Sequence, residues 1–274
     1  MARRRLLVVA AGGVMVGLGT LVGRGGTGSV HAAQDGTPQP AAREAGDTPS
    51  PTASRRPAET AAHGKTHPTA QPTAAPGSAA QQPVYYVDDG PKVIALTIDD
   101  GPNPVYTPQV LGVLEKYGVR ATFSMVGKNV SYYPGVAKDV AQAGHTVINH
   151  TWDHANLTTL SAKAQLEEIT RATDAIHAAS GTHPRMFRAP YGAWSKQVLK
   201  SCADQRLTPL DWSVDPRDWA RPGVSEIVRT IMNTTKSGSI ILEHDGGGDR
   251  SQTVAALKIV IPRLLDEGYR FAIA

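Results

Sequence analysis

Residues 93–102 read Val-Ile-Ala-Leu-Thr-Ile-Asp-Asp-Gly-Pro, an apolar run that ends in two adjacent acids and a Gly-Pro turn. Such a run predicts a buried strand that stops at the turn. An unpaired carboxylate beside a buried strand is costly, so Asp99 and Asp100 need partners that stabilise their charge. Taken alone, the pair is as consistent with a turn cap and a salt bridge as with catalysis.

On the C-terminal side of this strand, apolar runs alternate with segments of helical period. The predicted strands are 93–100, 121–126, 146–149, 186–189, 208–214, 239–243 and 270–273, and the predicted helices are 107–117, 134–143, 162–179, 195–203, 225–235 and 254–267. This order predicts an α/β fold with seven parallel strands and right-handed crossovers. The periodicity fits an incomplete barrel and an open doubly wound sheet equally well. Both architectures place working side chains at the C-terminal ends of the strands.

The first 83 residues have a different composition. Arg3, Arg4 and Arg5 precede an apolar run over 6–22 and a Val-His-Ala segment at 30–32, the plan of a secretory signal peptide. Residues 33–83 are rich in Ala, Pro and Thr and predict a disordered linker. We therefore expect three parts: 1–32, a signal peptide; 33–83, a linker; and 84–274, one folded domain. The expected protein is secreted and possibly associated with the cell wall, with no stable membrane insertion after cleavage. The alternative is a membrane anchor formed by an uncleaved signal.

Charge separates along the chain in the same way. Eight of the 28 basic and four of the 24 acidic residues precede residue 84, which leaves 20 of each sign in the folded part. The basic character of the chain therefore belongs to the signal and linker, and nucleic acid is not an expected partner. Cys202, the only cysteine, cannot form an internal disulfide and fits a buried packing position. We expect a monomer.

His150 and His154 follow the third predicted strand, four residues apart. Two histidines at this spacing can face one metal ion, although the spacing is common by chance. A carboxylate from another strand end, Asp100, would strengthen the case. Two neutral imidazoles and one carboxylate leave coordination positions open for water and substrate, as in catalytic zinc sites.

Five segments together resemble the ordered motifs of the NodB-type polysaccharide deacetylases, carbohydrate esterase family 4. They are 97–102, 150–154, 187–192 (Phe-Arg-Ala-Pro-Tyr-Gly), 215–219 and 242–245 (Leu-Glu-His-Asp), and the similarity spans nearly all of 90–274. The resemblance implies a distorted (β/α)7 barrel and one divalent ion, zinc or in some members cobalt, held by Asp100, His150 and His154. Departures from the pattern are small; Glu243, for example, stands where an apolar residue is common.

The resemblance also implies roles for the remaining motif residues. Asp99 would be the general base, oriented by Arg188, and His244 the general acid. The backbone N–H of Tyr191 would bind the oxyanion.

Asp218 matches the acid that holds the general-acid histidine, with Asp211 and Asp215 as weaker candidates. Trp219, Leu242 and Pro190 would line the pocket for the acetyl methyl group. Strand alternation predicts that Glu243 points away from His244 and from the site.

The leading hypothesis is metal-dependent hydrolysis of N-acetyl groups on an amino-sugar polymer, either peptidoglycan (its GlcNAc or MurNAc units) or chitin oligomers. A second is O-deacetylation of acetylated xylan, because an ester presents the same carbonyl with a better leaving group. A catalytically silent wall-glycan-binding protein would lack a motif residue, and none is missing. A metallophosphoesterase would often need two ions, and only one set of three ligands is visible.

Overall fold

The computed structural model describes residues 82–274. The predicted signal peptide and nearly all of the predicted linker therefore lie outside the described residues. None of the helices within 82–274 combines the length and the apolarity that crossing a bilayer requires.

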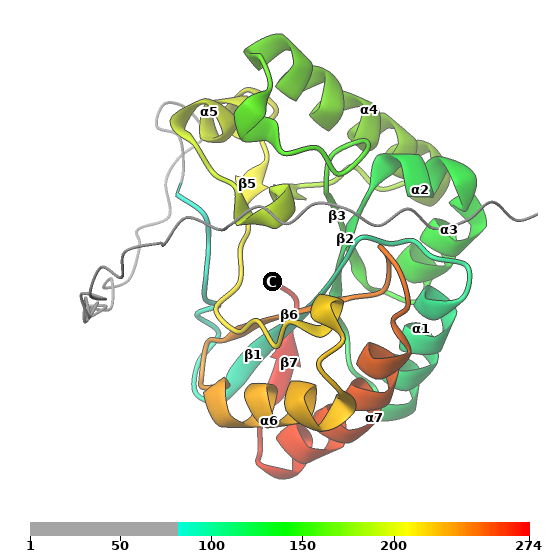
Figure 1. Cartoon of the computed structure of the whole chain (residues 1–274), viewed down its shortest axis with the longest axis vertical. Helices are drawn as coiled ribbons and strands as arrows, with labels where there is room; N and C mark the ends of the chain where they lie inside the picture. Colours follow the sequence, from blue (N-terminus) through cyan, green and yellow to red (C-terminus); the bar gives the residue numbers. More distant parts are fainter. Residues whose placement is uncertain (1–81) are drawn as a thin grey trace, which may run out of the picture. The chain divides into compact units, whose positions relative to one another are not determined.

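The seven predicted strands and the six predicted helices are all present along the described chain, with one further helix, α2 (Gly127–Tyr132), after the second strand (Figure 1). The strands are β1 (Val93–Asp99), β2 (Thr122–Met125), β3 (Thr146–Asn149), β4 (Met186–Phe187), β5 (Thr208–Pro209), β6 (Ile240–His244) and β7 (Arg270–Ala272). The helices are α1 (Tyr106–Tyr117), α2 (Gly127–Tyr132), α3 (Pro134–Gln142), α4 (Ala162–Ser180), α5 (Lys196–Asp204), α6 (Val224–Thr234) and α7 (Ser251–Asp266). Short 3₁₀ turns lie at η1 (Leu157–Thr159), η2 (Pro190–Gly192) and η3 (Asp218–Ala220).

The strands are all parallel and run in the order β5-β4-β3-β2-β1-β6, with β7 paired to the first half of β1. Strands β5 and β6 do not pair directly. Isolated bridges close this gap. In the segment before β1, Val84 pairs with Leu210 and Tyr86 pairs with Ser239. In the segment after β5, Val214 pairs with Ile241 of β6. The sheet thus curls into a distorted (β/α)7 barrel rather than an open doubly wound sheet.

Strand alternation divides the apolar residues between two layers. Along β1, Ile94, Leu96 and Ile98 belong to the large core between the sheet and the surrounding helices. Ala95 faces the barrel interior with Ile148, Leu210 and Ile240, which form a small apolar floor. Further along the same strands, the interior positions become polar.

The helix limits follow from local chemistry. Ser161 caps α4 by accepting a hydrogen bond from the Ala164 N–H (3.3 Å), and the helix ends at Gly181 with φ of 73°. The six-residue helix α2 was not predicted, because it is too short to show a helical period. It packs against α4 through Gly127, where a β-carbon would lie 2.6 Å from the Ala172 Cα.

This close approach predicts that Gly127→Ala destabilises the protein by about 1–3 kcal/mol, because the added methyl group meets backbone that cannot move alone. The matched control is Gly112→Ala in α1, where a β-carbon meets nothing within 4 Å. That change should stabilise the protein by roughly 0.5–1 kcal/mol. Urea denaturation of both variants checks the pair, and equal effects would contradict the packing described here.

Candidate active site

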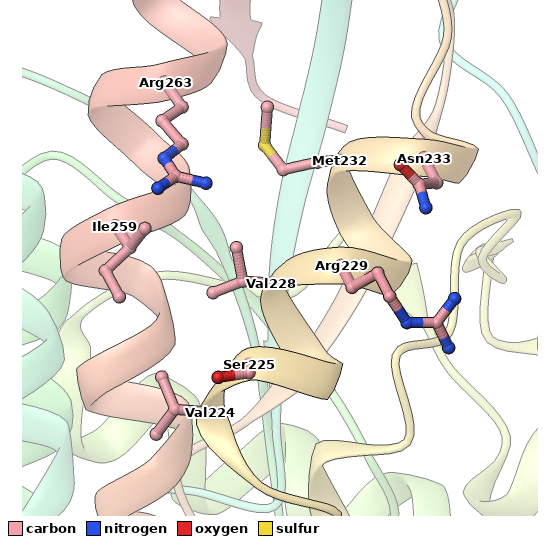
Figure 2. Close-up of a pocket in the computed structure, with 8 residues that line it drawn as sticks. All are labelled: Val224, Ser225, Val228, Arg229, Met232, Asn233, Ile259 and Arg263. Carbon is pink, nitrogen blue, oxygen red and sulfur yellow. The ribbon is translucent and has the colours of Figure 1, made fainter.

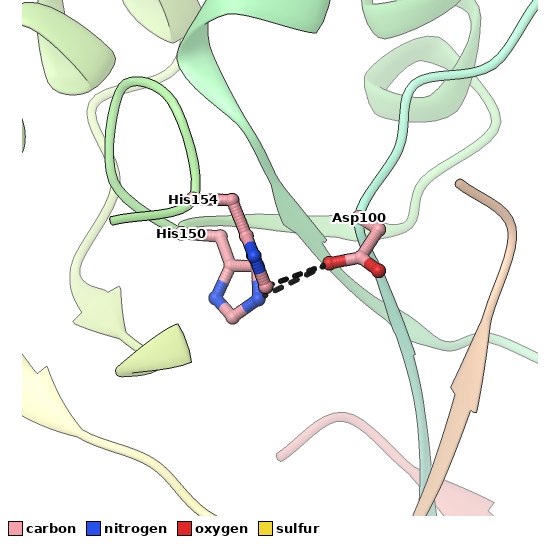
Figure 3. Close-up of side chains that lie close together, drawn as sticks. All are labelled: Asp100, His150 and His154. Carbon is pink, nitrogen blue, oxygen red and sulfur yellow. Dashed lines mark ion pairs between the residues drawn. The ribbon is translucent and has the colours of Figure 1, made fainter. Parts of the chain in front are cut away.

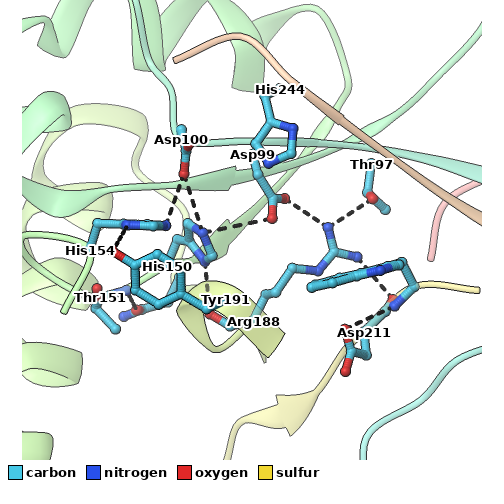
Figure 4. Close-up of polar contacts among 12 residues, drawn as sticks. Thr97, Asp99, Asp100, His150, Thr151, His154, Arg188, Tyr191, Asp211 and His244 are labelled. Atoms are coloured by element: carbon cyan, nitrogen blue, oxygen red, sulfur yellow. Dashed lines mark hydrogen bonds and ion pairs between the residues drawn. The ribbon is translucent and has the colours of Figure 1, made fainter. Parts of the chain in front are cut away.

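Polar side chains replace the apolar floor at the C-terminal ends of the strands. Thr97 and Asp99 follow Ala95 on the interior face of β1, and His150 lies two residues beyond Ile148 of the floor. On β6, Leu242 and His244 follow Ile240 on the same face. Several residues that the sequence predicted for the site lie together at the mouth of the barrel (Figure 4): Asp99, Asp100, His150, His154, Arg188, Tyr191 and His244.

Arg188 is fully buried and bonds to the interior face of β1. Its Nη1 donates to Asp99 Oδ1 at 2.7 Å and to Thr97 Oγ1 at 2.8 Å, and its Nη2 donates to the backbone oxygen of Asp211 at 3.0 Å. These bonds fix the guanidinium and compensate the buried negative charge of Asp99. The other oxygen of Asp99, Oδ2, lies 3.7 Å from His150 Nε2.

Asp100 faces the two predicted histidines. Its Oδ1 lies 3.5 Å from His150 Nε2 and 3.2 Å from His154 Nε2 (Figure 3). Burial opposes its ionisation, but the two imidazoles outweigh burial and hold the pKa of Asp100 well below its usual value. Within residues 82–274 these three form the one cluster of its kind able to hold an ion, with ligand atoms within 4.8 Å of one another.

The donor set fits a divalent metal ion. His150 Nδ1 lies 2.8 Å from the backbone oxygen of Arg188, which can only accept, so Nδ1 carries a proton and Nε2 is the ring nitrogen turned toward Asp100. Asp100 Oδ1 is buried and has no hydrogen-bond partner among the described residues, although both imidazoles are near it. A carboxylate oxygen without a hydrogen-bond partner, facing one ring nitrogen from each of two histidines, is the arrangement that a cation would complete.

Tyr191 contacts the second histidine. Its hydroxyl lies 3.2 Å from His154 Nδ1, and the two rings meet edge to face at 4.7 Å. The side chain is 68% exposed, so the ring closes the outer side of the cluster rather than packing in a core. The sequence predicted a role only for the backbone of Tyr191.

The backbone around the cluster is strained. Asp100, Thr151, His154 and Tyr191 all have φ between 63° and 72°, a region that residues with a β-carbon rarely occupy. At Asp100 the left-handed turn ends the strand immediately after Asp99. Such conformations persist only where the surroundings enforce them, and their concentration here indicates a functional site.

His244 and Asp218 form a second buried pair at the mouth. His244 Nδ1 lies 2.7 Å from Asp218 Oδ1, and the His244 backbone N–H donates to Asp218 Oδ2 at 2.9 Å. Thr253 Oγ1 also donates to Oδ2, at 2.6 Å. Burial disfavours the charge on His244, but the hydrogen bond and charge of Asp218 outweigh burial and raise the pKa of His244 to about 9.

The two other aspartates weighed for this role lie elsewhere. Asp211 Oδ2 accepts a bond from Trp194 Nε1 at 2.8 Å, and Asp215 Oδ1 accepts one from the Arg217 N–H at 2.8 Å. Neither contacts His244 in the way that Asp218 does. Asp211 instead supports the site through its backbone oxygen, which holds Arg188.

The three residues expected around the acetyl group differ in exposure. Leu242 is buried on the interior face of β6, and Pro190 is buried at the start of η2. Trp219 is 45% exposed in η3, with the Arg217 guanidinium 5.0 Å from its ring centre. The pocket they would form stays a prediction.

The sequence did not single out the residues that support the site from behind. Thr97 reads as an ordinary strand residue, but its position two before Asp99 places it on the same face. Asn129 donates to the backbone oxygen of Asp100 at 2.8 Å, from a helix that the sequence did not predict. Thr253 reaches Asp218 from α7, far along the chain.

A groove between α6 and α7 is separate from this cluster (Figure 2). Val224, Val228 and Met232 of α6 and Ile259 and Arg263 of α7 are among the residues that line it. None of the polar residues at the barrel mouth lines this groove, so it is not a candidate for the active site.

The fold is a parallel barrel with a carboxylate and two imidazoles at its mouth, beside a buried Asp–His pair. These features are those of an α/β-barrel hydrolase, and the comparisons with known proteins agree. The family model described as polysaccharide deacetylase matches residues 86–210. A peptidoglycan-N-acetylglucosamine deacetylase of Bacillus cereus is 43% identical over 187 residues, 68% of this chain and 87% of the relative. The chain belongs to the polysaccharide deacetylase family.

Two further comparisons agree. A chitooligosaccharide deacetylase of Sinorhizobium fredii is 41% identical over 191 residues, 66% of this chain and 89% of the relative. A crystal structure of a peptidoglycan N-acetylglucosamine deacetylase, in complex with an N-hydroxybenzamide, superposes with a TM-score of 0.67 at 32% identity. It covers 69% of this chain and 89% of that one. The barrel and the family expected from the sequence are thus confirmed.

The geometry of the buried pair predicts an unusual titration of His244. In the metal-stripped full-length protein, NMR should show the His244 imidazole titrating near pH 9. Asp218→Asn should lower its pKa toward or below the ordinary value of about 6.5, because the hydrogen bond and charge of Asp218 are lost and burial is opposed only by the charges of Asp99 and Asp100. Asp215→Asn is the control and should leave the titration unchanged. A wild-type His244 that titrates near 6.5 would contradict the described pairing.

Proposed function

We propose that this protein hydrolyses N-acetyl groups on an amino-sugar polymer, using one divalent metal ion held by Asp100, His150 and His154. The observation that carries the proposal is the buried, donor-free Oδ1 of Asp100 facing the ring nitrogens of two histidines. A zinc or cobalt ion bound there would supply a Lewis acid for the acetamide carbonyl and would acidify a water molecule.

Asp99 accepts the proton of the attacking water. Its Oδ1 is held by Arg188 at 2.7 Å, which fixes the carboxylate in one orientation. Its Oδ2 lies on the side of His150, 3.7 Å from Nε2, and so faces the cluster where the water would lie. Arg188 thus acts by positioning the base, and its own bonds to Thr97 and Asp211 keep it rigid.

His244 donates the proton that the leaving amine nitrogen needs. An amide nitrogen leaves poorly unless it is protonated, so the acid must be charged at working pH. Asp218 keeps His244 in that state. His244 lies at the end of β6, in register with Asp99 on β1, so acid and base flank one space at the barrel mouth.

The remaining predicted residues complete the site. The backbone N–H of Tyr191 donates to the oxygen that becomes negative as the carbonyl is attacked. Trp219, Leu242 and Pro190 receive the methyl group of the acetyl. The tyrosine amide thus stabilises the negative charge on the carbonyl oxygen, and His244 protonates the leaving nitrogen on the other side.

We assign the catalytic domain to residues 84–274 and propose a secretory signal at 1–32 followed by a linker at 33–83. The composition of the first 83 residues supports export and attachment near the cell wall, where peptidoglycan or chitin would be the substrate. The named relatives that act on N-acetylglucosamine polymers support an amino-sugar substrate.

Acetate release by the purified, metal-loaded protein tests the reaction. Chitin oligomers, peptidoglycan and acetylated xylan are assayed in parallel. Release from one amino-sugar substrate supports the proposal and identifies the target. Release from xylan alone would make the protein an esterase, and no release from any of the three would favour a silent glycan-binding protein.

Separate substitutions distinguish the base from the ligands. Asp99→Asn should keep one bound ion per chain but lower turnover by about 10²–10⁴-fold, because it removes the proton acceptor and no predicted ligand. His150→Ala should lose both the ion and the activity. The exposed His177→Ala is the matched control and should change neither. Metal analysis and acetate release are measured on the same samples, and full activity in Asp99→Asn would overturn the assigned base.

A further inference from the structure

Glu243 is a fully buried carboxyl group outside the set of proposed catalytic residues. It lies on β6 between Leu242 and His244, and its side chain faces the layer between the sheet and the helices, as does that of Ile241. Its exposed fraction is 0%, and neither carboxyl oxygen receives a hydrogen bond from an N–H or O–H group in the described part of the chain. An ionised carboxylate without donors would be very costly here.

The groups near Glu243 explain how it is accommodated. Asp218 of η3 lies beside this end of β6, because its Oδ2 accepts the backbone N–H of the next residue, His244, at 2.9 Å. Asp215 lies on the segment before η3, and Arg250 precedes α7. Burial, then the charge of Asp218 and its hydrogen bond, raise the pKa of Glu243 well above its usual value; Arg250 opposes this but does not prevail. Two carboxyl groups in contact share a site stably only when one is protonated.

The hydrogen bonds show which of the two carries the proton. Asp218 accepts bonds from the His244 ring, the His244 backbone and Thr253, all of which favour its ionised form. Burial works against ionisation of Asp218, but the bonds with His244 outweigh it, and the pKa of Asp218 is lowered. Glu243 has no such donors, so of the two carboxyl groups Glu243 is the one better able to hold a proton.

We propose that Glu243 is a positioning residue that stays protonated in the working protein and donates a hydrogen bond to Asp218, which moderates how strongly Asp218 holds the proton of His244. The proposal rests on the acid role proposed for His244. A donor to Asp218 withdraws negative charge from the oxygens that His244 contacts, so His244 releases its proton more readily. An apolar residue at 243 would leave Asp218 a stronger acceptor.

The first test asks whether Glu243 is neutral, and it requires no activity. A carboxyl group whose pKa is raised on folding stabilises the native state least at high pH, since the unfolded chain loses the proton first. The melting temperature of full-length Glu243→Gln, relative to wild type, should therefore rise steadily between pH 5 and pH 8. The exposed Glu115→Gln in α1 is the control, and its difference from wild type should stay flat. A flat difference for Glu243→Gln would overturn the proposal.

The second test asks whether the hydrogen bond reaches His244. In the metal-stripped full-length protein, Glu243→Met should raise the NMR titration of His244 by about one pH unit, roughly the effect of one hydrogen bond to a charged group. Glu243→Gln, which retains a donor, should restore the wild-type titration. In the metal-loaded protein, the pH at which kcat/KM falls on the basic side should likewise be higher in Glu243→Met than in wild type, and unchanged in Glu243→Gln. An unchanged His244 titration in Glu243→Met would refute the positioning role.

These readouts separate the two proposals. If no substrate releases acetate, the proposed function fails, while the melting and NMR measurements still decide whether Glu243 donates to Asp218. If acetate is released but the His244 titration ignores residue 243, the inference about Glu243 fails alone.

Discussion

The site depends on how one strand ends. Along β1 the side chains alternate, so Asp99 faces the barrel interior and the next residue would ordinarily face the helices. The left-handed conformation of Asp100 (φ 72°) breaks this alternation and turns the second carboxylate toward the histidines. Two adjacent acids thereby reach the same space from different directions. One is neutralised by Arg188, and the other is left for a cation.

The surrounding structure enforces this strained turn. The glycine loop after His244 packs against the backbone of Asp100, where a side chain on Gly246 would collide with the Asp100 carbonyl group. Asn129 holds that carbonyl oxygen at 2.8 Å. The mouth of the barrel then has two electrostatic halves: a carboxylate compensated by a buried arginine, and an imidazole compensated by a buried aspartate.

The sequence predicted the repeating elements well because apolar period and glycine stops are local signals. The predicted strand over 208–214 is longer than the observed β5, which ends at Pro209. The residues beyond Pro209 join the barrel only through isolated pairs, such as Val84 with Leu210. The motif residues were predictable through family resemblance, and the structure brings Asp100, His150 and His154 together. The supporting contacts of Thr97, Asn129 and Thr253 could not be predicted, because they connect segments far apart in the chain. Glu243 was expected to point away from the site. Alternation along β6 puts it on the face opposite His244, but its proximity to Asp218 depends on a loop whose path no local pattern reveals.

The central claim is that one metal ion completes the cluster of Asp100, His150 and His154 and that the reaction requires it. Calorimetric titration of Zn²⁺ into the metal-stripped full-length protein, with acetate release from an acetylated amino-sugar oligomer followed at each addition, tests this most directly. The account predicts saturation at one ion per chain, with activity rising in proportion to occupancy. Saturation at two ions, or activity that is complete before any metal is added, would contradict it.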